Sequence, residues 1–366
     1  MTIQLSGNSG SARVGAAPDP LVPTLFHEPW WLDAATGGRY EQVIVRSGGR
    51  DVGRLPFLRS KQFGLTEFVL PQLTPFLGPA VDEGNGRAVQ RADTRRRIIH
   101  GLLDQLPAHS RFHQRLSAGS NDPMPFVERN YGGDVDFTYE VPPNSDEVMW
   151  GHLRDKTRNV IRRAQENSQL VDLDPIAFSQ LYEGNLRRRG LLFNYMWGAP
   201  ALPVFEAAIA RGRARLLGAR DSSGNVVAAT FVAWDHATTY LILTTRRPST
   251  HGGIVSLLIW EAMKESAARG TTFDFGGVGT RGSVLFYSGF GGVVAPRYVV
   301  WRATRTFSAL DFSARKARSL ATKMLAPVTR WAAEAAPRVH QRERSFPSRH
   351  LLHEPTLCTL QAGLGH

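Results

Sequence analysis

The stretch from Val226 to Gly292 constrains the fold of this chain more than any other part of the sequence. It begins with two runs that alternate apolar and small residues, 226–234 and 239–245, separated by a short turn. This pattern predicts an antiparallel hairpin. A polar, glycine-containing loop, a helical run and a further extended run follow in that order. An order in which strands and helices mix in this way predicts an α+β fold built on a mixed α/β sheet.

The loop between the hairpin and the helical run carries the main chemical signal. A helix N-terminus leaves backbone N–H groups unpaired and carries about half a positive charge, so it attracts phosphate. Glycines would let a phosphate approach the backbone, and nearby arginines add positive charge. Simple capping of the helix explains the same residues equally well. The loop residues concerned are Arg246, Arg247, Ser249, Thr250, Gly252 and Gly253.

Several other chemistries find no support in the sequence. The chain lacks G-x-x-x-x-G-K-[ST], so nucleotide hydrolysis of the usual kind is not expected. Cys358 is the single cysteine, which excludes disulfides within the chain and suits a reducing compartment. The eleven histidines show no H-E-x-x-H pattern, so we expect no metal site.

Charge points to anionic partners. The 366 residues include 44 Lys and Arg against 32 Asp and Glu, a formal net charge of +12. Phosphorylated small molecules, nucleic acid or an acidic membrane surface would suit this charge, although an arginine-rich proteome would also produce it. No apolar run is long enough to span a bilayer and no signal-like leader is present, so we expect a cytoplasmic protein.

Length predicts two domains and an appendage. Residues 1–20 are rich in Gly, Ser, Ala and Pro and are expected to be disordered. Residues 21–143 read as one α+β unit, ending at a Pro- and Asn-containing boundary where Ser145 or Asn144 could cap the next helix. Residues 144–305 form the second unit. Residues 306–366 form an Ala- and Arg-rich tail, helical or disordered, that could lie on an anionic membrane at the inner face.

A basic helix is predicted at 150–164. Its apolar residues share one stripe, which leaves several cations and an amide on the remaining faces. Arginines four residues apart could hold a phosphate or carboxylate with two guanidinium groups, although a solvated basic face is the simpler interpretation. The candidates for binding an anionic acceptor are Lys156, Arg158, Asn159 and Arg162.

These segments resemble a known family. The helix Leu153–Ala164, the run Phe273-Asp274-Phe275-Gly276-Gly277 and the run Phe286-Tyr287-Ser288-Gly289-Phe290-Gly291 look like the Fem-like branch of the GNAT acyltransferases. The segment 74–79, Thr-Pro-Phe-Leu-Gly-Pro, is similar to the first-domain loop of that branch. The resemblance covers about residues 24–303, and it implies two tandem GNAT-like domains followed by the basic tail.

The resemblance implies an acyl-CoA co-substrate and no metal. It places the donor pyrophosphate at the loop before the helix, at Ser249, Thr250, His251, Gly252, Gly253 and Ile254, although the usual [QR]-x-x-G-x-[GA] signature is absent there. The family commonly has Phe-Lys where this chain has Phe286-Tyr287. A tyrosine at 287 could donate a proton to a thiolate leaving group. Asp274 or His251 could act as the base, and Thr74 and Phe76 would face the acceptor.

The expected activity is N-acyl transfer by direct attack, with no covalent enzyme intermediate. The acceptor would be an anionic small-molecule amine, from a sugar nucleotide, a cell-envelope precursor or a secondary metabolite. One alternative is an aminoacyl-tRNA-dependent transferase of the peptidoglycan-bridge type, which would bind tRNA in a salt-dependent way. Another is a non-catalytic GNAT-like binding scaffold. The sequence does not determine the oligomeric state.

Overall fold

The computed structural model describes residues 19–118, 122–188, 201–248, 250 and 253–317. Its strands are β1 Tyr40–Ser47, β2 Arg50–Gln62, β3 Leu65–Val69, β4 Ala80–Val81, β5 Arg111–Arg115, β6 Gly132–Val141, β7 Gln169–Asp172, β8 Ala214–Arg220, β9 Val226–Trp234, β10 Thr238–Arg246, β11 Thr272–Asp274 and β12 Val293–Ala303. They form one 12-stranded mixed sheet in the order β1-β2-β3-β5-β12-β6-β11-β10-β9-β8-β7, with β4 paired to β2. The predicted α+β class is confirmed.

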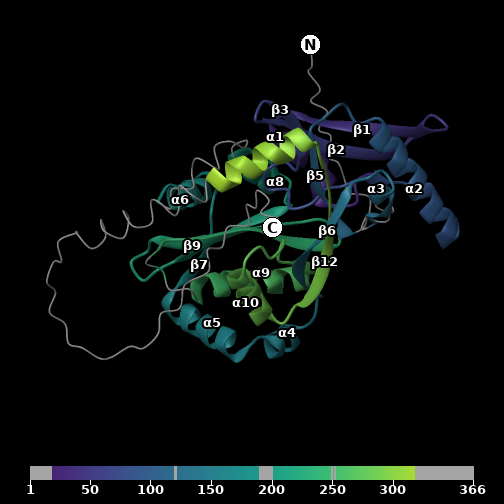
Figure 1. The fold of residues 1–366 in the computed structure, drawn as a ribbon. Helices are drawn as coiled ribbons and strands as arrows, with labels where there is room; N and C mark the ends of the chain where they lie inside the picture. Colours follow the sequence, from purple (N-terminus) through teal and green to yellow (C-terminus); the bar gives the residue numbers. More distant parts are fainter. Residues whose placement is uncertain (1–18, 119–121, 189–200, 249, 251–252, 318–366) are drawn as a thin grey trace, which may run out of the picture.

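The helices cover both faces of this sheet (Figure 1). They are η1 Leu25–His27, α1 Pro29–Thr36, α2 Ala88–Asp104, α3 Met124–Val127, α4 Asp146–His152, α5 Asp155–Asn167, α6 Pro175–Arg188, α8 Leu202–Ala210, α9 Gly253–Ala268, α10 Arg281–Tyr287 and η3 Ser288–Phe290. Residues 305–317 form a further helix. Among the described residues, none of the helices combines the length and the apolar character needed to cross a bilayer.

The strand β9 shows how the layers are built. Phe231 points to a core shared with α1, α6 and α8, whereas Val232 points to a core shared with α5 and α9. Alternate residues of one strand therefore enter two cores, because successive side chains of a strand point to opposite faces. We call these two sides the α1 face and the α9 face. A third core lies between α2 and strands β2, β3 and β5.

The strand β12 joins the two halves of the chain. It belongs to the C-terminal part of the chain, yet it lies inside the sheet, between β5 of the first half and β6. The first unit contributes to the second in return, since Phe26 and Trp31 belong to the same core as Phe231. The predicted domain boundary near residue 143 therefore does not separate two cores, because one core contains residues from both sides of it. The boundary itself stays a prediction.

The predicted basic helix at 150–164 is two helices. Ser145 caps the first by accepting a hydrogen bond from the backbone N–H of Val148 at 3.4 Å, as the sequence predicts. The chain then extends at Leu153 and Arg154, where the Arg154 N–H donates to the Gly289 carbonyl at 2.9 Å. Leu153 fits the apolar stripe of a continuous helix, so the sequence pattern does not reveal the break.

Candidate functional site

The strands β10 and β11 part at a fork. They pair in parallel only from Thr238 to Tyr240 on β10 and from Thr272 to Asp274 on β11, while β10 continues to Arg246. β11 also pairs with β6 on its other side, and after Asp274 the chain stays with β6 alone: Phe275 N–H donates to the Tyr139 carbonyl at 3.1 Å and Val278 N–H to the Phe137 carbonyl at 2.9 Å. The fork leaves the backbone edges of 241–246 and 275–278 diverging from one point. Helix α9 begins directly after the longer arm.

Gly276 closes the base of the fork. Its φ is +74°, and a Cβ placed there would lie 2.7 Å from the carbonyl oxygen of Leu241. Both the backbone conformation and the lack of space require glycine. The glycine pair in Phe273-Asp274-Phe275-Gly276-Gly277 therefore lets the departing chain pass against β10.

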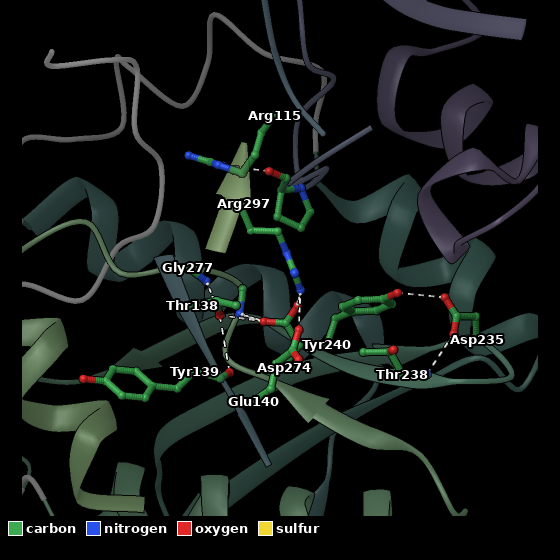
Figure 2. Close-up of polar contacts among 12 residues, drawn as sticks. Arg115, Thr138, Tyr139, Glu140, Asp235, Thr238, Tyr240, Asp274, Gly277 and Arg297 are labelled. Carbon is green, nitrogen blue, oxygen red and sulfur yellow. Dashed lines mark hydrogen bonds and ion pairs between the residues drawn. The ribbon is translucent and has the colours of Figure 1, made fainter. Parts of the chain in front are cut away.

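A buried ion cluster lies at the fork on the α1 face (Figure 2). Asp274 Oδ1 accepts hydrogen bonds from Thr138 Oγ1 at 2.6 Å and from Gly276 N–H at 2.8 Å. Asp274 Oδ2 accepts from Nη2 of Arg297 at 2.8 Å, and the same nitrogen donates to Glu140 Oε1 at 2.6 Å. The sheet register places Glu140 directly opposite Asp274, which explains how one guanidinium reaches both carboxylates.

Charge pairing holds Arg297 ionised despite its burial. Burial lowers the pKa of the Arg297 guanidinium, but Asp274 and Glu140 outweigh it and the pKa is raised above its ordinary value. The Asp274 side chain is 1% exposed, whereas that of Glu140 is 27% exposed. Glu140 is therefore the carboxylate of the cluster that a ligand can reach.

A second carboxylate organises the other side of the fork. Asp235 Oδ2 accepts from the Tyr240 hydroxyl and from the backbone N–H of Leu25, each at 2.9 Å, so it also ties η1 to β10. Burial, with Asp235 and Asp274 nearby, raises the pKa of Tyr240 well above its ordinary value. Tyr240 therefore stays protonated and acts here as a hydrogen-bond donor.

Comparison with known families identifies this arrangement. Residues 151–282 match the family model of the acetyltransferase (GNAT) domain, and this range contains the fork and α9. This segment is therefore similar to a GNAT domain. The resemblance that the sequence suggests is confirmed for this segment.

Solved structures extend the likeness to both halves of the fold. FemX is 12% identical with a TM-score of 0.53, and the match covers 74% of this chain and 90% of FemX. The C-terminal domain assigned to a lysylphosphatidylglycerol synthetase from Agrobacterium fabrum is 14% identical with a TM-score of 0.51, covering 78% of this chain and 89% of that domain. At such identities the likeness concerns the fold. No match is found among the curated proteins.

The predicted donor loop of the GNAT domain is only partly described. Ser249, His251 and Gly252 lie outside the described residues. Thr250 accepts a hydrogen bond at its carbonyl from Arg246 Nη1 at 2.8 Å, and its hydroxyl donates to the Val227 carbonyl at 3.3 Å. Gly253 and Ile254 form the first turn of α9 and are buried. The loop thus returns the chain from β10 to the start of α9.

The two other predicted catalytic residues lie on opposite faces of the fork. Tyr287 is 2% exposed on the α9 face, with its ring centroid 4.7 Å from that of Phe275, the first residue after β11. Asp274 lies on the α1 face in the ion cluster described above. Both of its oxygens accept hydrogen bonds from neighbouring groups, so its environment suits positioning better than proton transfer.

The predicted acceptor residues do not form one site. Phe76 packs on the α1 face, 5.6 Å from the Tyr240 ring and 5.4 Å from the Arg297 guanidinium carbon. Thr74 accepts a hydrogen bond from Trp31 Nε1 at 3.1 Å, and both Thr74 and Phe76 are buried. The set Lys156, Arg158, Asn159 and Arg162 lies on α5, across the sheet on the α9 face.

Local partners hold the α5 arginines. Arg158 Nη2 pairs with Asp155, and Arg158 Nη1 donates to the carbonyl of Gly151 at 3.4 Å. Arg162 lies 5.4 Å from the Trp150 ring and donates to Asn159 at 3.3 Å. An acceptor role for these side chains stays a prediction, and it would concern a surface separate from the ion cluster.

The expectation that no G-x-G-x-x-G opens a helix after a strand is wrong, since such a pattern lies between β11 and α10. Gly277-Val278-Gly279-Thr280-Arg281-Gly282 has the spacing G-x-G-x-x-G. The helix that follows has only seven residues, and the Thr280 hydroxyl accepts from the Ser283 N–H at 3.1 Å. The strand β12 that comes next contains no acidic residue to bind a ribose. The surroundings of a dinucleotide-binding motif are therefore missing in this part of the chain.

Sequence reasoning also missed Thr138, Glu140 and Arg297. The sequence does contain a signal for the Asp274–Arg297 pair. Asp274 interrupts an apolar strand between two phenylalanines, and Arg297 interrupts the apolar strand β12. A buried charge needs a partner, so two such interruptions suggest that they meet. The choice of partner depends on β6 and β12 being neighbours, which the chain order does not reveal.

Proposed function

We propose that this protein transfers an acyl group from acyl-CoA to an amine, with the donor on the α9 face and the acceptor on the α1 face. The fork supports this most strongly, because it is the place in the sheet where a linear group can pass between unpaired strand edges. The acyl carbonyl would lie between the two arms, close to Gly276. Backbone N–H groups on the longer arm, beyond Leu241, would polarise it, since those of Gly276 and Gly277 already donate to Asp274 Oδ1 and Thr138 Oγ1.

On the donor side, the start of α9 and Tyr287 would act on the acyl-CoA. The first turn of α9, from Gly253 and Ile254, would face the pyrophosphate, since backbone N–H groups at a helix N-terminus attract anions. Tyr287 lies against Phe275 at the root of the shorter arm. It would give its proton to the thiolate as the carbon–sulfur bond breaks.

On the acceptor side, Glu140 would act as the base, rather than Asp274 or His251. Glu140 is the more exposed carboxylate at the fork, and Arg297 fixes its position through a 2.6 Å hydrogen bond. The amine nitrogen would form the new bond to the acyl carbon, and Glu140 would take the proton that the nitrogen loses. Asp274 would hold Arg297 in place.

The proposed acceptors are amines of sugar nucleotides, cell-envelope precursors or secondary metabolites. Binding calorimetry with acetyl-CoA, longer acyl-CoAs and charged tRNA tests the donor. We expect micromolar binding of at least one acyl-CoA, competed by free CoA. Binding of charged tRNA alone would contradict the proposal and favour the aminoacyl-tRNA alternative. Binding of neither donor would favour a non-catalytic scaffold.

A further inference from the structure

Trp301 is an exposed aromatic residue held rigidly on the α1 face. It lies on β12 with 41% of its surface exposed. Its indole Nε1 donates a hydrogen bond to Asp134 Oδ2 at 2.8 Å. An exposed tryptophan whose N–H is anchored has lost most of its rotational freedom before any ligand arrives.

The indole of Trp301 packs directly on Gly132. The two residues are directly opposite in the β6–β12 register, and a Cβ at Gly132 would lie 2.6 Å from Cε2 and 2.7 Å from Cζ2 of Trp301. The ring therefore lies over the glycine backbone. With the ring over Gly132 and its Nε1 bonded to Asp134, 41% of Trp301 remains exposed.

Polar groups continue from this ring toward the fork. Asp134, Asp136, Thr138 and Glu140 alternate along β6, so all four share the α1 face with Trp301. Thr138 is buried, so a ligand on this face would meet Asp134, Asp136 and Glu140. Asp136 is 39% exposed and accepts from Arg115 Nε at 2.9 Å. Eight residues of strand separate Gly132 from Glu140, which corresponds to about 27 Å at the usual rise. A ligand that touches both ends must be extended.

Hydroxyl-rich ligands suit this row, because it presents both acceptors and a donor. The carboxylates of Asp134 and Asp136 can accept hydrogen bonds from hydroxyl groups, and the Arg115 guanidinium beside Asp136 can donate to them. His113, opposite Trp301 on β5, adds no charge at neutral pH, because burial, and then Arg111 and Arg115, lower its pKa to about 4.

We propose that Trp301 stacks on a sugar ring of an oligosaccharide whose hydroxyl groups bind along β6. The apolar face of a pyranose can pack on the exposed part of the indole, and its hydroxyl groups can bond the carboxylates of Asp134 and Asp136. That the far end of this oligosaccharide presents an amine to Glu140, and so acts as the acceptor, rests on the proposed function. The binding platform itself does not.

The test is titration of partly deacetylated chito-oligosaccharides into the full chain, followed by calorimetry. We expect Trp301→Ala to weaken binding at least tenfold. Phe137→Ala is the matched control, since Phe137 is a 47% exposed aromatic on the same strand pair but on the α9 face. It should bind like the wild type. Asp134→Asn, which keeps an oxygen for Nε1, should retain the platform.

Three outcomes would overturn the inference: no binding of any oligosaccharide, equal loss in Trp301→Ala and Phe137→Ala, or tighter binding of AMP or UMP than of the oligosaccharides. If Trp301→Ala unfolds, Gly132→Ala moves the ring without removing it and should weaken binding in the same way. Acyl-CoA titrations on the same samples separate the two proposals. If the wild type binds acyl-CoA but no oligosaccharide, only the sugar-binding role of Trp301 is refuted.

Discussion

The charged residues at the fork differ in their surroundings, and we expect them to differ in their roles. Asp274 and Arg297 are both buried and bonded to each other, whereas Glu140 shares the same guanidinium and keeps one side toward solvent. Removing one partner of a buried ion pair is costly, because the remaining charge stays buried with neither a counter-charge nor water to stabilise it. Substitutions at these positions should therefore affect different properties of the protein.

Glu140→Gln should lower kcat by a factor of about 10² to 10⁴, because a general base of this kind contributes that much. Its amide oxygen can still accept from Arg297, so stability should change little. Glu41→Gln serves as the control. Glu41 lies on β1, where its carboxylate pairs with Arg59 of β2, and its substitution should leave the rate unchanged. Retention of the full rate in Glu140→Gln would remove Glu140 from the reaction.

Asp274→Ala should destabilise the fold by roughly 3–5 kcal/mol, the range for removing one partner of a buried ion pair. Chemical denaturation measures this change directly. A fully stable Asp274→Ala protein that has lost its activity would show instead that Asp274 takes part in the chemistry.

At the scale of elements, local pattern predicted most of the second half. The hairpin at β9 and β10, the long helix α9 and the short strand β11 lie where alternation, periodicity and glycine placement put them. The fork itself was not visible, because it depends on 275–278 staying with β6, a strand more than a hundred residues earlier, after the pairing with β10 ends. Chain order contains no signal for that choice.

Gly276→Ala should weaken acyl-CoA binding at least tenfold, which corresponds to about 1.4 kcal/mol. The added Cβ would press on the Leu241 carbonyl and move the two arms of the fork. Gly270→Ala is the control, because Gly270 has a similar φ of +72° and nothing within 4 Å of its Cβ position. Calorimetry should show donor binding intact in Gly270→Ala. Equal affinity in both variants would place the donor elsewhere.

At the scale of the whole molecule, the two halves share a sheet and a core. The N-terminal η1 packs on the second half through Phe26, whose ring lies 4.8 Å from that of Tyr240, and His27 lies buried beside it. The sequence pattern gives the elements of each half but not this exchange, since it arises from strand neighbours far apart along the chain. Packing between the halves should therefore be sensitive to changes in η1.

His27 should make folding stability depend on pH. Its Nδ1 accepts from the Thr24 hydroxyl at 2.8 Å, its Nε2 donates to the Gly78 carbonyl at 3.3 Å, and burial, then Arg54, lower its pKa to about 3. The unfolded chain binds a proton near pH 6.5 and the folded chain does not. Stability is therefore complete above pH 6.5 and falls as the pH drops toward 3, by up to about 5 kcal/mol.

The free energy of unfolding of His27→Gln, measured against pH beside the wild type, isolates this effect from the carboxylates. The glutamine variant should be less stable at neutral pH and should show a weaker loss between pH 6.5 and 3. Parallel pH curves for the two proteins would show that His27 is not the group responsible.

The decisive measurement is an acyl-transfer assay with the full chain, acyl-CoAs of increasing length and a panel of amines that includes amino sugars. Release of CoA thiol and formation of acylated amine are followed together. We expect one thiol released for each amide formed, only when an amine is present, and a large loss in Glu140→Gln but not in Glu41→Gln. Amide formation from charged tRNA, with no acyl-CoA consumed under any condition, would contradict acyl-CoA as the donor.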